Sequence, residues 1–240
     1  MSKACFDYGH GGKDPGAVGN GLREKDLTLA IGKKVKAIVE KHGVKVVETR
    51  SNDKYLSLTE RANISNRNNV DIFVSFHINS ATNVNARGFE IWTTVGQTQG
   101  DIIATAIGKQ LMEDFPHVPF RTDYSDGDLD KERNFTVIAK TKAPACLIEI
   151  GFIINKIDAQ MLKTEQDKIA ESISKGILKY LGIAYDKNKV KVRIKGKLYH
   201  FDGVKQDNTN YVAIRQVAEA LGYKVDWDNT KKEVLINLRK

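Results

Sequence analysis

The chain has 240 residues, of which 41% are hydrophobic and 28% are charged, a composition typical of a soluble globular protein with one medium and one small domain. It contains no apolar run of the ~18 residues that a membrane span needs, and MSKACFDYGHGG at its N-terminus lacks the apolar core of a signal peptide. We therefore expect a protein made in the cytoplasm, unless a leader has been removed.

The net charge of +8 is concentrated at one end of the chain. Residues 186–240 contain thirteen Lys or Arg against seven Asp or Glu, so the part of the chain before them is nearly neutral. This basic C-terminal piece is the candidate for binding a polyanion. The two cysteines, Cys5 and Cys146, lie in apolar runs, and we expect them to be buried, reduced thiols.

Strand and helix patterns alternate along residues 1–183. We expect strands at Lys3–Tyr8, Lys45–Thr49, Asp71–His77, Phe89–Thr93, Asn134–Ala139 and Ala145–Ile150. We expect helices at Lys25–Lys41, Ser57–Arg67 with its capping box, Gln99–Asp114, and Asp158–Leu181 with a break near Thr164. The alternation predicts an α/β domain over residues 1–183, with a mostly parallel, twisted sheet flanked by helices.

The segment Phe115–Arg133 is long, polar and irregular, with an acidic cluster inside it. Long irregular segments in compact domains are often functional, so we expect this one to border the substrate groove.

A linker is expected at residues 184–189, followed by a small α+β module over residues 190–240. Val190, Val192 and Ile194 alternate with cations, which predicts a strand with its apolar side chains on one face. Lys195-Gly196 predicts a hairpin turn. A helix at Ile214–Leu221 and a second hairpin formed by Lys224–Trp227 and Glu233–Leu238 complete the module.

Two histidines and one glutamate lie at or near the ends of apolar strands. His10 follows the first strand in GHGG, His77 ends DIFVSFH, and Glu149 lies within ACLIEIGF. The carboxyl ends of strands in an open α/β sheet are where sites are built. Two imidazoles and a carboxylate can hold zinc with one position left open for water, and a further carboxylate can act as a base. The set therefore points to metal-assisted hydrolysis.

The two glutamates differ in how strongly the sequence favours a function. Glu24 precedes a helix, where it is equally well explained as a favourable acid in the first turn or as a metal ligand. Glu149 lies in an almost wholly apolar run, and an unpaired buried carboxylate is costly, so it either meets a cation or is tuned for proton transfer.

The order of the motifs resembles a known family. DYGHGGKDPGAVG, REKDLTLAIGKKV, ETRSND, SLTERANISN, DIFVSFHINS, GFEIW and PACLIEIGFIIN follow one another as in the zinc-dependent N-acetylmuramoyl-L-alanine amidases of the type-3 family, found in autolysins and endolysins. The resemblance covers nearly the whole of the expected α/β domain. It implies that His10, Glu24 and His77 are zinc ligands and that Glu149 is the catalytic glutamate. Asn79 and Arg61 also match family positions, and we assign them supporting, substrate-binding roles.

The resemblance implies a peptidoglycan hydrolase that cleaves the amide between N-acetylmuramic acid and L-alanine. Without a signal peptide, we expect a phage endolysin released through a membrane pore. The alternatives are a host autolysin of the same activity, a zinc peptidase that cuts within the stem peptide, and a non-catalytic wall-binding protein. The residues alone do not separate the peptidase from the amidase.

The C-terminal sequence YVAIRQVAEALGYKVDWDNTKKEVLI resembles the small module named after the N-terminal domain of copper amine oxidase, and similar modules accompany cell-wall enzymes. The odd positions Lys187, Lys189, Lys191, Arg193, Lys195 and Lys197 predict a single cationic stripe if the strand is regular. Two interpretations stay open: edge protection against aggregation, and docking on anionic wall polymers such as teichoic acids. Nucleic acid is disfavoured, because the stripe lacks interleaved aromatic residues.

Overall fold

The computed structural model describes residues 1–187, 190–206, 209–231 and 233–238. The chain forms two compact units, one of Met1–Glu40 and Val44–Ile183 and the other of Lys41–Gly43 and Ala184–Lys240. Asn188 and Lys189 of the expected linker lie outside the described residues. Among the helices described, none combines the length and the apolar character needed to cross a membrane.

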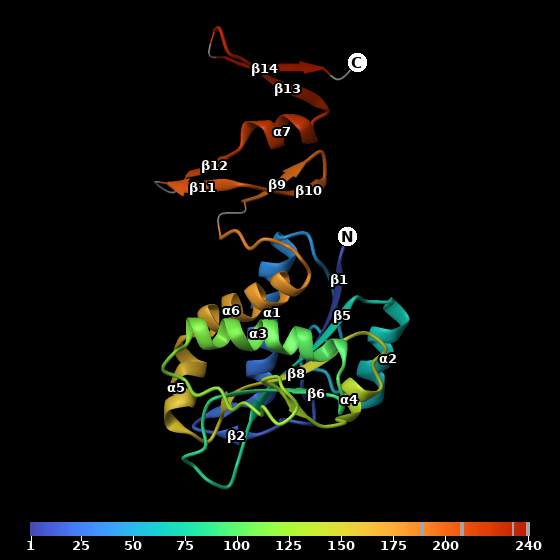
Figure 1. The fold of residues 1–240 in the computed structure, drawn as a ribbon, viewed down its shortest axis with the longest axis vertical. Helices are drawn as coiled ribbons and strands as arrows, with labels where there is room; N and C mark the ends of the chain where they lie inside the picture. Colours follow the sequence, from blue (N-terminus) through green and yellow to red (C-terminus); the bar gives the residue numbers. More distant parts are fainter. Residues whose placement is uncertain (188–189, 207–208, 232, 239–240) are drawn as a thin grey trace. The chain divides into compact units, whose positions relative to one another are not determined.

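The larger unit is built on a six-stranded sheet in the order β4-β1-β5-β8-β6-β7 (Figure 1). Its strands are β1 (Lys3–Tyr8), β4 (Lys45–Glu48), β5 (Ile72–Asn79), β6 (Phe89–Thr93), β7 (Lys131–Glu132) and β8 (Ala145–Phe152). The first four strands of that order are parallel, β6 runs antiparallel to β8, and β7 runs parallel to β6. The sheet is therefore mostly parallel, as the sequence predicts.

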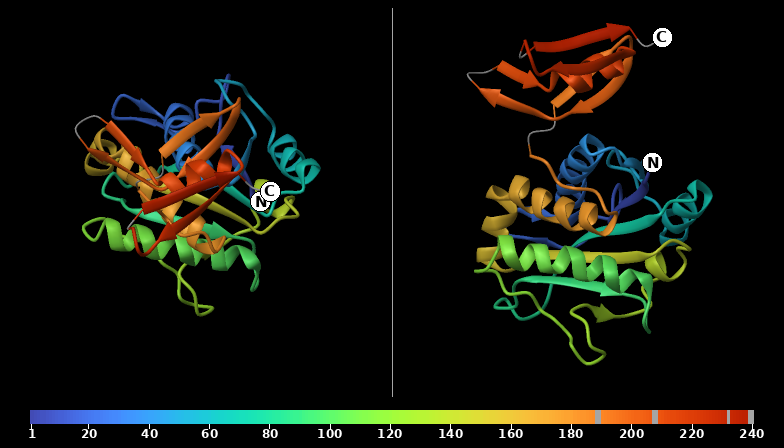
Figure 2. Two further views of the ribbon diagram at one scale, coloured as in Figure 1. Left: turned by 90° about the horizontal axis from the view of Figure 1, so that it is seen from above. Right: turned by 45° about the horizontal axis from the view of Figure 1, so that its top comes forward.

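Helices cover both faces of this sheet (Figures 1 and 2). They are α1 (Glu24–Lys41), α2 (Leu58–Asn68), α3 (Gln99–Asp114), α4 (Thr136–Ala139), α5 (Lys156–Thr164) and α6 (Gln166–Tyr180). α3 packs along α6, and α1 joins α6 through an ion pair between Lys34 and Asp167. α2 packs against α4. The right-handed crossovers β1-α1-β4 and β4-α2-β5 run in opposite directions, which places α1 and α2 on opposite faces.

The two central strands β5 and β8 are apolar on both sides because helices bury both of their faces. Phe73 and Phe76 of β5 are fully buried, as is Ile148 of β8. Cys5 and Cys146 are also buried and free, which confirms the prediction for both thiols.

The segments around α4 and between α5 and α6 test two of the expected elements. The strand expected at Asn134–Ala139 is wrong: residues 136–139 form the single helical turn α4, which buries Val137 and Ile138. The strand that pairs with β6 at the sheet edge is instead β7, from the segment Phe115–Arg133. The break expected near Thr164 is confirmed, because Glu165 separates α5 from α6.

In the smaller unit, the described residues form three hairpins and one helix. Its elements are β9 (Val190–Ile194), β10 (Lys197–Phe201), β11 (Gly203–Gln206), β12 (Thr209–Val212), α7 (Ile214–Ala220), β13 (Tyr223–Asp228) and β14 (Glu233–Leu238). A further short hairpin, β2 (Val18–Gly19) with β3 (Leu22–Arg23), lies in the glycine-rich loop of the larger unit.

The single cationic stripe is contradicted by the turn between β9 and β10. Lys195 and Gly196 both have positive φ and reverse the chain. In an antiparallel pair, opposite residues share a face, and Lys197 lies opposite Ile194, so it shares the face of the apolar side chains. Arg193 keeps its exposed position, whereas Lys189 lies outside the described residues.

Gly176 lets α6 approach α3 closely. A Cβ atom at this position would lie 2.5 Å from Cα of Ile107 on α3. We predict that Gly176→Ala lowers the free energy of unfolding by about 1–3 kcal/mol, since the two helix backbones must separate. Urea unfolding measures this. Lys179→Ala, an exposed change on the same helix, is the control, and a Gly176→Ala variant as stable as that control would contradict the packing argument.

Candidate metal centre and active site

The chain turns sharply where β1 ends, and two buried arginines hold that turn. Arg50 donates to the carbonyl oxygens of Tyr8 (2.8 Å) and Gly9 (3.0 Å). Arg61 donates to the carbonyl oxygens of Tyr8 (2.6 Å) and His10 (2.7 Å). His10 adopts a left-handed backbone conformation, with φ of 62°. Such a conformation is unfavourable outside glycine and persists only where surrounding contacts enforce it.

Asp7 supplies the counter-charge for this pair of cations. Its carboxylate is fully buried and accepts from Arg61 (2.9 Å), Thr49 (2.7 Å) and Ser75 (2.7 Å). Burial alone would raise the pKa of Asp7, but Arg61 and the two hydroxyl donors outweigh it and lower that pKa. The carboxylate is therefore charged, and its negative charge offsets the repulsion between the two buried arginines.

Glu24 is positioned by backbone donors from two segments. It begins α1 and is 4% exposed. Its Oε2 accepts from the N–H of Ala17 (2.8 Å) and its Oε1 from the N–H of Ile78 (3.0 Å). The sequence left Glu24 undecided between a helix-capping acid and a ligand. The structure directs its carboxylate at both histidines.

His10, Glu24 and His77 form a cluster whose ligand atoms all lie within 4.8 Å of one another. Oε1 of Glu24 lies 3.1 Å from Nε2 of His10 and 2.9 Å from Nδ1 of His77. Asp14 contacts Nδ1 of His10 at 2.8 Å, the arrangement by which an outer carboxylate orients an imidazole ligand. Asp14 was not predicted from the sequence, although it lies only four residues after His10.

The electrostatics of the cluster suit a bound cation. Burial tends to lower the pKa of each imidazole, but contacts with Glu24 outweigh it and raise the pKa of His10 and His77. Burial tends to raise the pKa of Glu24, and the two imidazoles reverse that shift and lower it. A site that stabilises positive charge on two imidazoles also stabilises a divalent ion that replaces their protons. Two nitrogens and one oxygen are a donor set that zinc accepts.

Two glycines make room for the imidazole rings. A Cβ atom at Gly9 would lie 2.4 Å from Cε1 of His77, and one at Gly16 would lie 2.6 Å from Cδ2 of His10. The ring centroids lie 5.0 Å apart, and a side chain at either glycine would collide with one of the rings. The glycine-rich loop thus leaves the space that the histidine cluster needs.

Glu149 lies beside this cluster on β8. In the register of the sheet it is the neighbour of His77 on β5 and of Glu90 on β6, so the three residues form a row across adjacent strands. Its Oε2 is buried with no hydrogen-bond partner. Burial raises the pKa of Glu149 to about 7, with His77 opposing this and Glu24 and Glu90 adding to it. A carboxyl poised near neutral pH can both accept and return a proton.

Glu90, the neighbour of Glu149 on β6, is a buried carboxylate that was not predicted from the sequence. It is 3% exposed and accepts from Asn79 (2.9 Å), Arg121 (2.6 Å) and Lys131 (3.0 Å). Its position within the apolar stretch GFEIW gives the same signal that identified Glu149. Through Arg121 and Lys131, Glu90 ties the segment Phe115–Arg133 to the sheet.

The cluster opens into a cleft of about 460 Å³. His10, Glu24, His77 and Glu149 all line it, together with Asn79 and with Arg133, the last residue of the segment expected to border the groove. Arg61 is 2% exposed and is not among the residues that line the cleft. It donates to the carbonyl oxygens of Leu56 and His10, so its position suits support of His10 rather than contact with a substrate.

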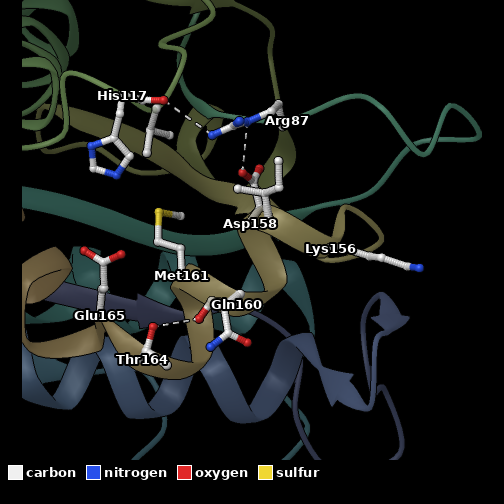
Figure 3. Close-up of a pocket in the computed structure, with 10 residues that line it drawn as sticks. Arg87, His117, Lys156, Asp158, Gln160, Met161, Thr164 and Glu165 are labelled. Carbon is white, nitrogen blue, oxygen red and sulfur yellow. Dashed lines mark hydrogen bonds and ion pairs between the residues drawn. The ribbon is translucent and has the colours of Figure 1, made fainter.

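A second cleft, of about 370 Å³, lies against α5 (Figure 3). Its walls are Met161 and Val118, with Arg87 approaching the buried Asp158 at 3.6 Å. Two backbone N–H groups already donate to Asp158, from Gly88 and Phe152. None of the residues described as lining this cleft belongs to the histidine cluster, so the first cleft is the candidate active site.

The pKa of Glu149 predicts a pH-dependent stability for protein kept free of metal by a chelator. The pKa of the folded state lies above the ordinary 4.5, so ionisation of Glu149 destabilises the folded state progressively from about pH 4.5 to 7. Glu149→Gln removes this loss. We expect equal free energies of unfolding at pH 4 and a variant more stable by about 3 kcal/mol at pH 8. Glu113→Gln, at an exposed carboxylate, is the control, and a difference that does not grow with pH would contradict the prediction.

Comparison with known proteins identifies the family. Residues 5–179 match the N-acetylmuramoyl-L-alanine amidase family, and residues 193–240 match the copper amine oxidase N-terminal domain. The sporulation-specific N-acetylmuramoyl-L-alanine amidase of Bacillus subtilis is 37% identical over 73% of this chain and 65% of its own. The endolysin of Bacillus phage SPP1 is 35% identical over 76% of this chain and 68% of its own.

Solved structures agree with this assignment. The amidase AmiC2 of Nostoc punctiforme is similar with a TM-score of 0.69 and 36% identity, over 75% of this chain and 97% of that one. The family match over residues 5–179 includes the histidine cluster and every residue that lines the cleft, and it spans more than half of the chain. The chain therefore belongs to the N-acetylmuramoyl-L-alanine amidase family and is an enzyme that acts on peptidoglycan.

Proposed function

We propose that this amidase depends on zinc held by His10, Glu24 and His77, and that Glu149 is its general base. The observation that carries the proposal is the meeting of three ligand atoms within 4.8 Å, beside a buried carboxylate with an unpartnered oxygen, in one cleft. Zinc, when bound, supplies a Lewis acid that polarises the scissile carbonyl and makes a water more acidic.

The residues of the chain supply the proton transfers. Glu149 accepts a proton from the attacking water and returns it to the nitrogen of L-alanine as that amine leaves. A pKa raised to about 7 suits both steps, because the same carboxyl must take up and release a proton near neutral pH. Asn79, which lines the cleft and is fixed by Glu90, is placed to bind the substrate, and Arg61 supports His10 from behind.

The roles of the site residues separate in one set of variants. We expect Glu149→Gln to lose at least about a hundredfold in turnover of purified walls while retaining zinc, because proton transfer is lost and the ligands are not. His10→Ala and His77→Ala should lose zinc and activity together. Metal analysis and wall turbidity measure these outcomes. Near-normal lysis by Glu149→Gln would remove Glu149 from the mechanism, and chelation without effect would remove zinc.

The position of the cleaved bond distinguishes an amidase from a zinc peptidase. Mass analysis of the digest should find stem peptides with a free L-alanine amino terminus and glycan strands left uncut. Cuts within the stem peptide would support the peptidase, and the absence of any cut with zinc loaded would support a non-catalytic wall-binding protein.

For the biological setting we propose a phage endolysin. The similarity to the endolysin of phage SPP1 supports it, and the similarity to the sporulation-specific amidase supports a host autolysin. The neighbouring genes decide: a pore-forming lysis gene beside this one supports the endolysin, and a bacterial chromosomal setting without phage genes supports the autolysin.

We also propose that the C-terminal module docks on anionic wall polymers through the cations of β9. The strand alternates apolar and charged residues, and the exposed Arg193 lies on the side away from Val192. The strand ends at the turn that contains Lys195, so the cations to test are those that precede this turn in the sequence, Lys189, Lys191 and Arg193.

Reversing Lys189, Lys191 and Arg193 to Glu should weaken binding of the full chain to purified walls at least severalfold at low salt. The reason is loss of Coulomb attraction, so wild-type binding should also weaken as salt rises. Both proteins carry Glu149→Gln so that the walls stay intact, and pelleting with walls measures binding. Equal binding at low salt would leave these cations as edge protection.

A further inference from the structure

Arg133 is a cation in the active-site cleft to which the proposed mechanism assigns no role. It lines the same cleft as His77 and Glu149, and it is the only lysine or arginine among the described residues that do so. It lies at the end of the segment Phe115–Arg133, directly after β7.

The backbone and an aromatic platform fix the position of Arg133. Its N–H donates to the carbonyl oxygen of Thr93 (2.9 Å), and its own carbonyl accepts from the N–H of Phe135 (2.7 Å). The guanidinium carbon lies 5.0 Å from the centre of the Phe135 ring, and this ring packs edge-on against Trp92 at 5.5 Å. A guanidinium stacked on an aromatic face loses less freedom when it binds a ligand.

The charge of Arg133 is not neutralised by the protein. Its neighbours Arg121 and Lys131 share the carboxylate of Glu90. In the part of the chain that the structure describes, no carboxylate pairs with Arg133, and its side chain is exposed. An oriented, unpaired guanidinium beside a catalytic carboxylate is suited to bind an anionic group of the substrate.

We propose that Arg133 binds the free carboxylate of the second residue of the stem peptide and thereby sets a preference among peptidoglycans. The proposal rests on the proposed function. The lactyl carboxyl of muramic acid is consumed in the scissile amide, so it carries no charge. The next residue after L-alanine is a D-glutamate linked through its γ-carboxyl, and its α-carboxyl is either a free carboxylate or, in amidated walls, a neutral carboxamide. A guanidinium distinguishes these two by charge and by its two parallel donors.

The test uses two substrates that differ only at this group. Uncross-linked glycan strands carry stem peptides with either D-glutamate or D-isoglutamine, and release of the L-alanine amino terminus is followed. We expect the wild-type enzyme to prefer the acid about tenfold in kcat/KM, mostly through KM, a ratio typical of a charge-assisted pair. Arg133→Gln should lower kcat/KM for the acid to the level of the amide and leave the amide unchanged. Arg133→Lys should keep part of the preference.

The control is Arg67→Gln, an exposed arginine on α2 that does not line the cleft. Equal turnover of both substrates by the wild-type enzyme would overturn the proposal, as would a loss in Arg133→Gln that is equal for acid and amide. Failure of the wild-type enzyme to release L-alanine termini from either strand or from whole walls would instead overturn the proposed function. The two failures are therefore distinguishable.

Discussion

The active site depends on the pairing of two buried guanidinium groups with three consecutive carbonyl groups. The chain leaves the sheet at Tyr8, Gly9 and His10, and Arg50 and Arg61 donate hydrogen bonds to the carbonyl oxygens of these residues. Loss of these donors would cost about 1–3 kcal/mol for each buried carbonyl left unpaired, although the carbonyl of Gly9 also accepts from the Thr28 hydroxyl. The turn brings the imidazole of His10 to Glu24, so the geometry of the His10–Glu24–His77 cluster depends on hydrogen bonds made by two arginines outside it.

Three buried carboxylates of this domain each face positively charged or protonatable groups. Asp7 neutralises Arg61, Glu24 faces two imidazoles, and Glu90 faces Arg121 and Lys131. Glu149 is the exception, because its Oε2 has no donor. The groups that face Asp7 and Glu24 outweigh burial and lower the pKa of each, whereas burial raises the pKa of Glu149. That contrast is what an acid–base group needs.

The sequence predicted the sheet and most helices, and it singled out His10, His77 and Glu149, which the structure brings into one cleft, because each left a local signal. Parallel strands read as apolar runs, and His10, His77 and Glu149 interrupt such runs with polar groups. The prediction of a strand at Asn134–Ala139 was wrong because Phe135, Val137 and Ile138 favour strands locally, whereas tertiary packing against α2 accompanies a helical turn there. Arg50 escaped notice because its partners are backbone oxygens, and a sequence carries no mark of which carbonyls lack a partner. Arg133 escaped because an unpaired charge is recognised only when all its neighbours are known.

The site is assembled from residues that lie far apart along the chain. β1 must pair with β5, and β5 with β8, before His10, His77 and Glu149 face one another. Such non-local parallel pairings form late, since long loops must close first. During synthesis, the three residues proposed to hold zinc leave the ribosome well before the segment that carries Glu149. Under the proposed function, a nascent chain that ends before β8 has the metal ligands but lacks the carboxylate that moves the proton, so hydrolysis begins only when nearly the whole domain has been made and folded.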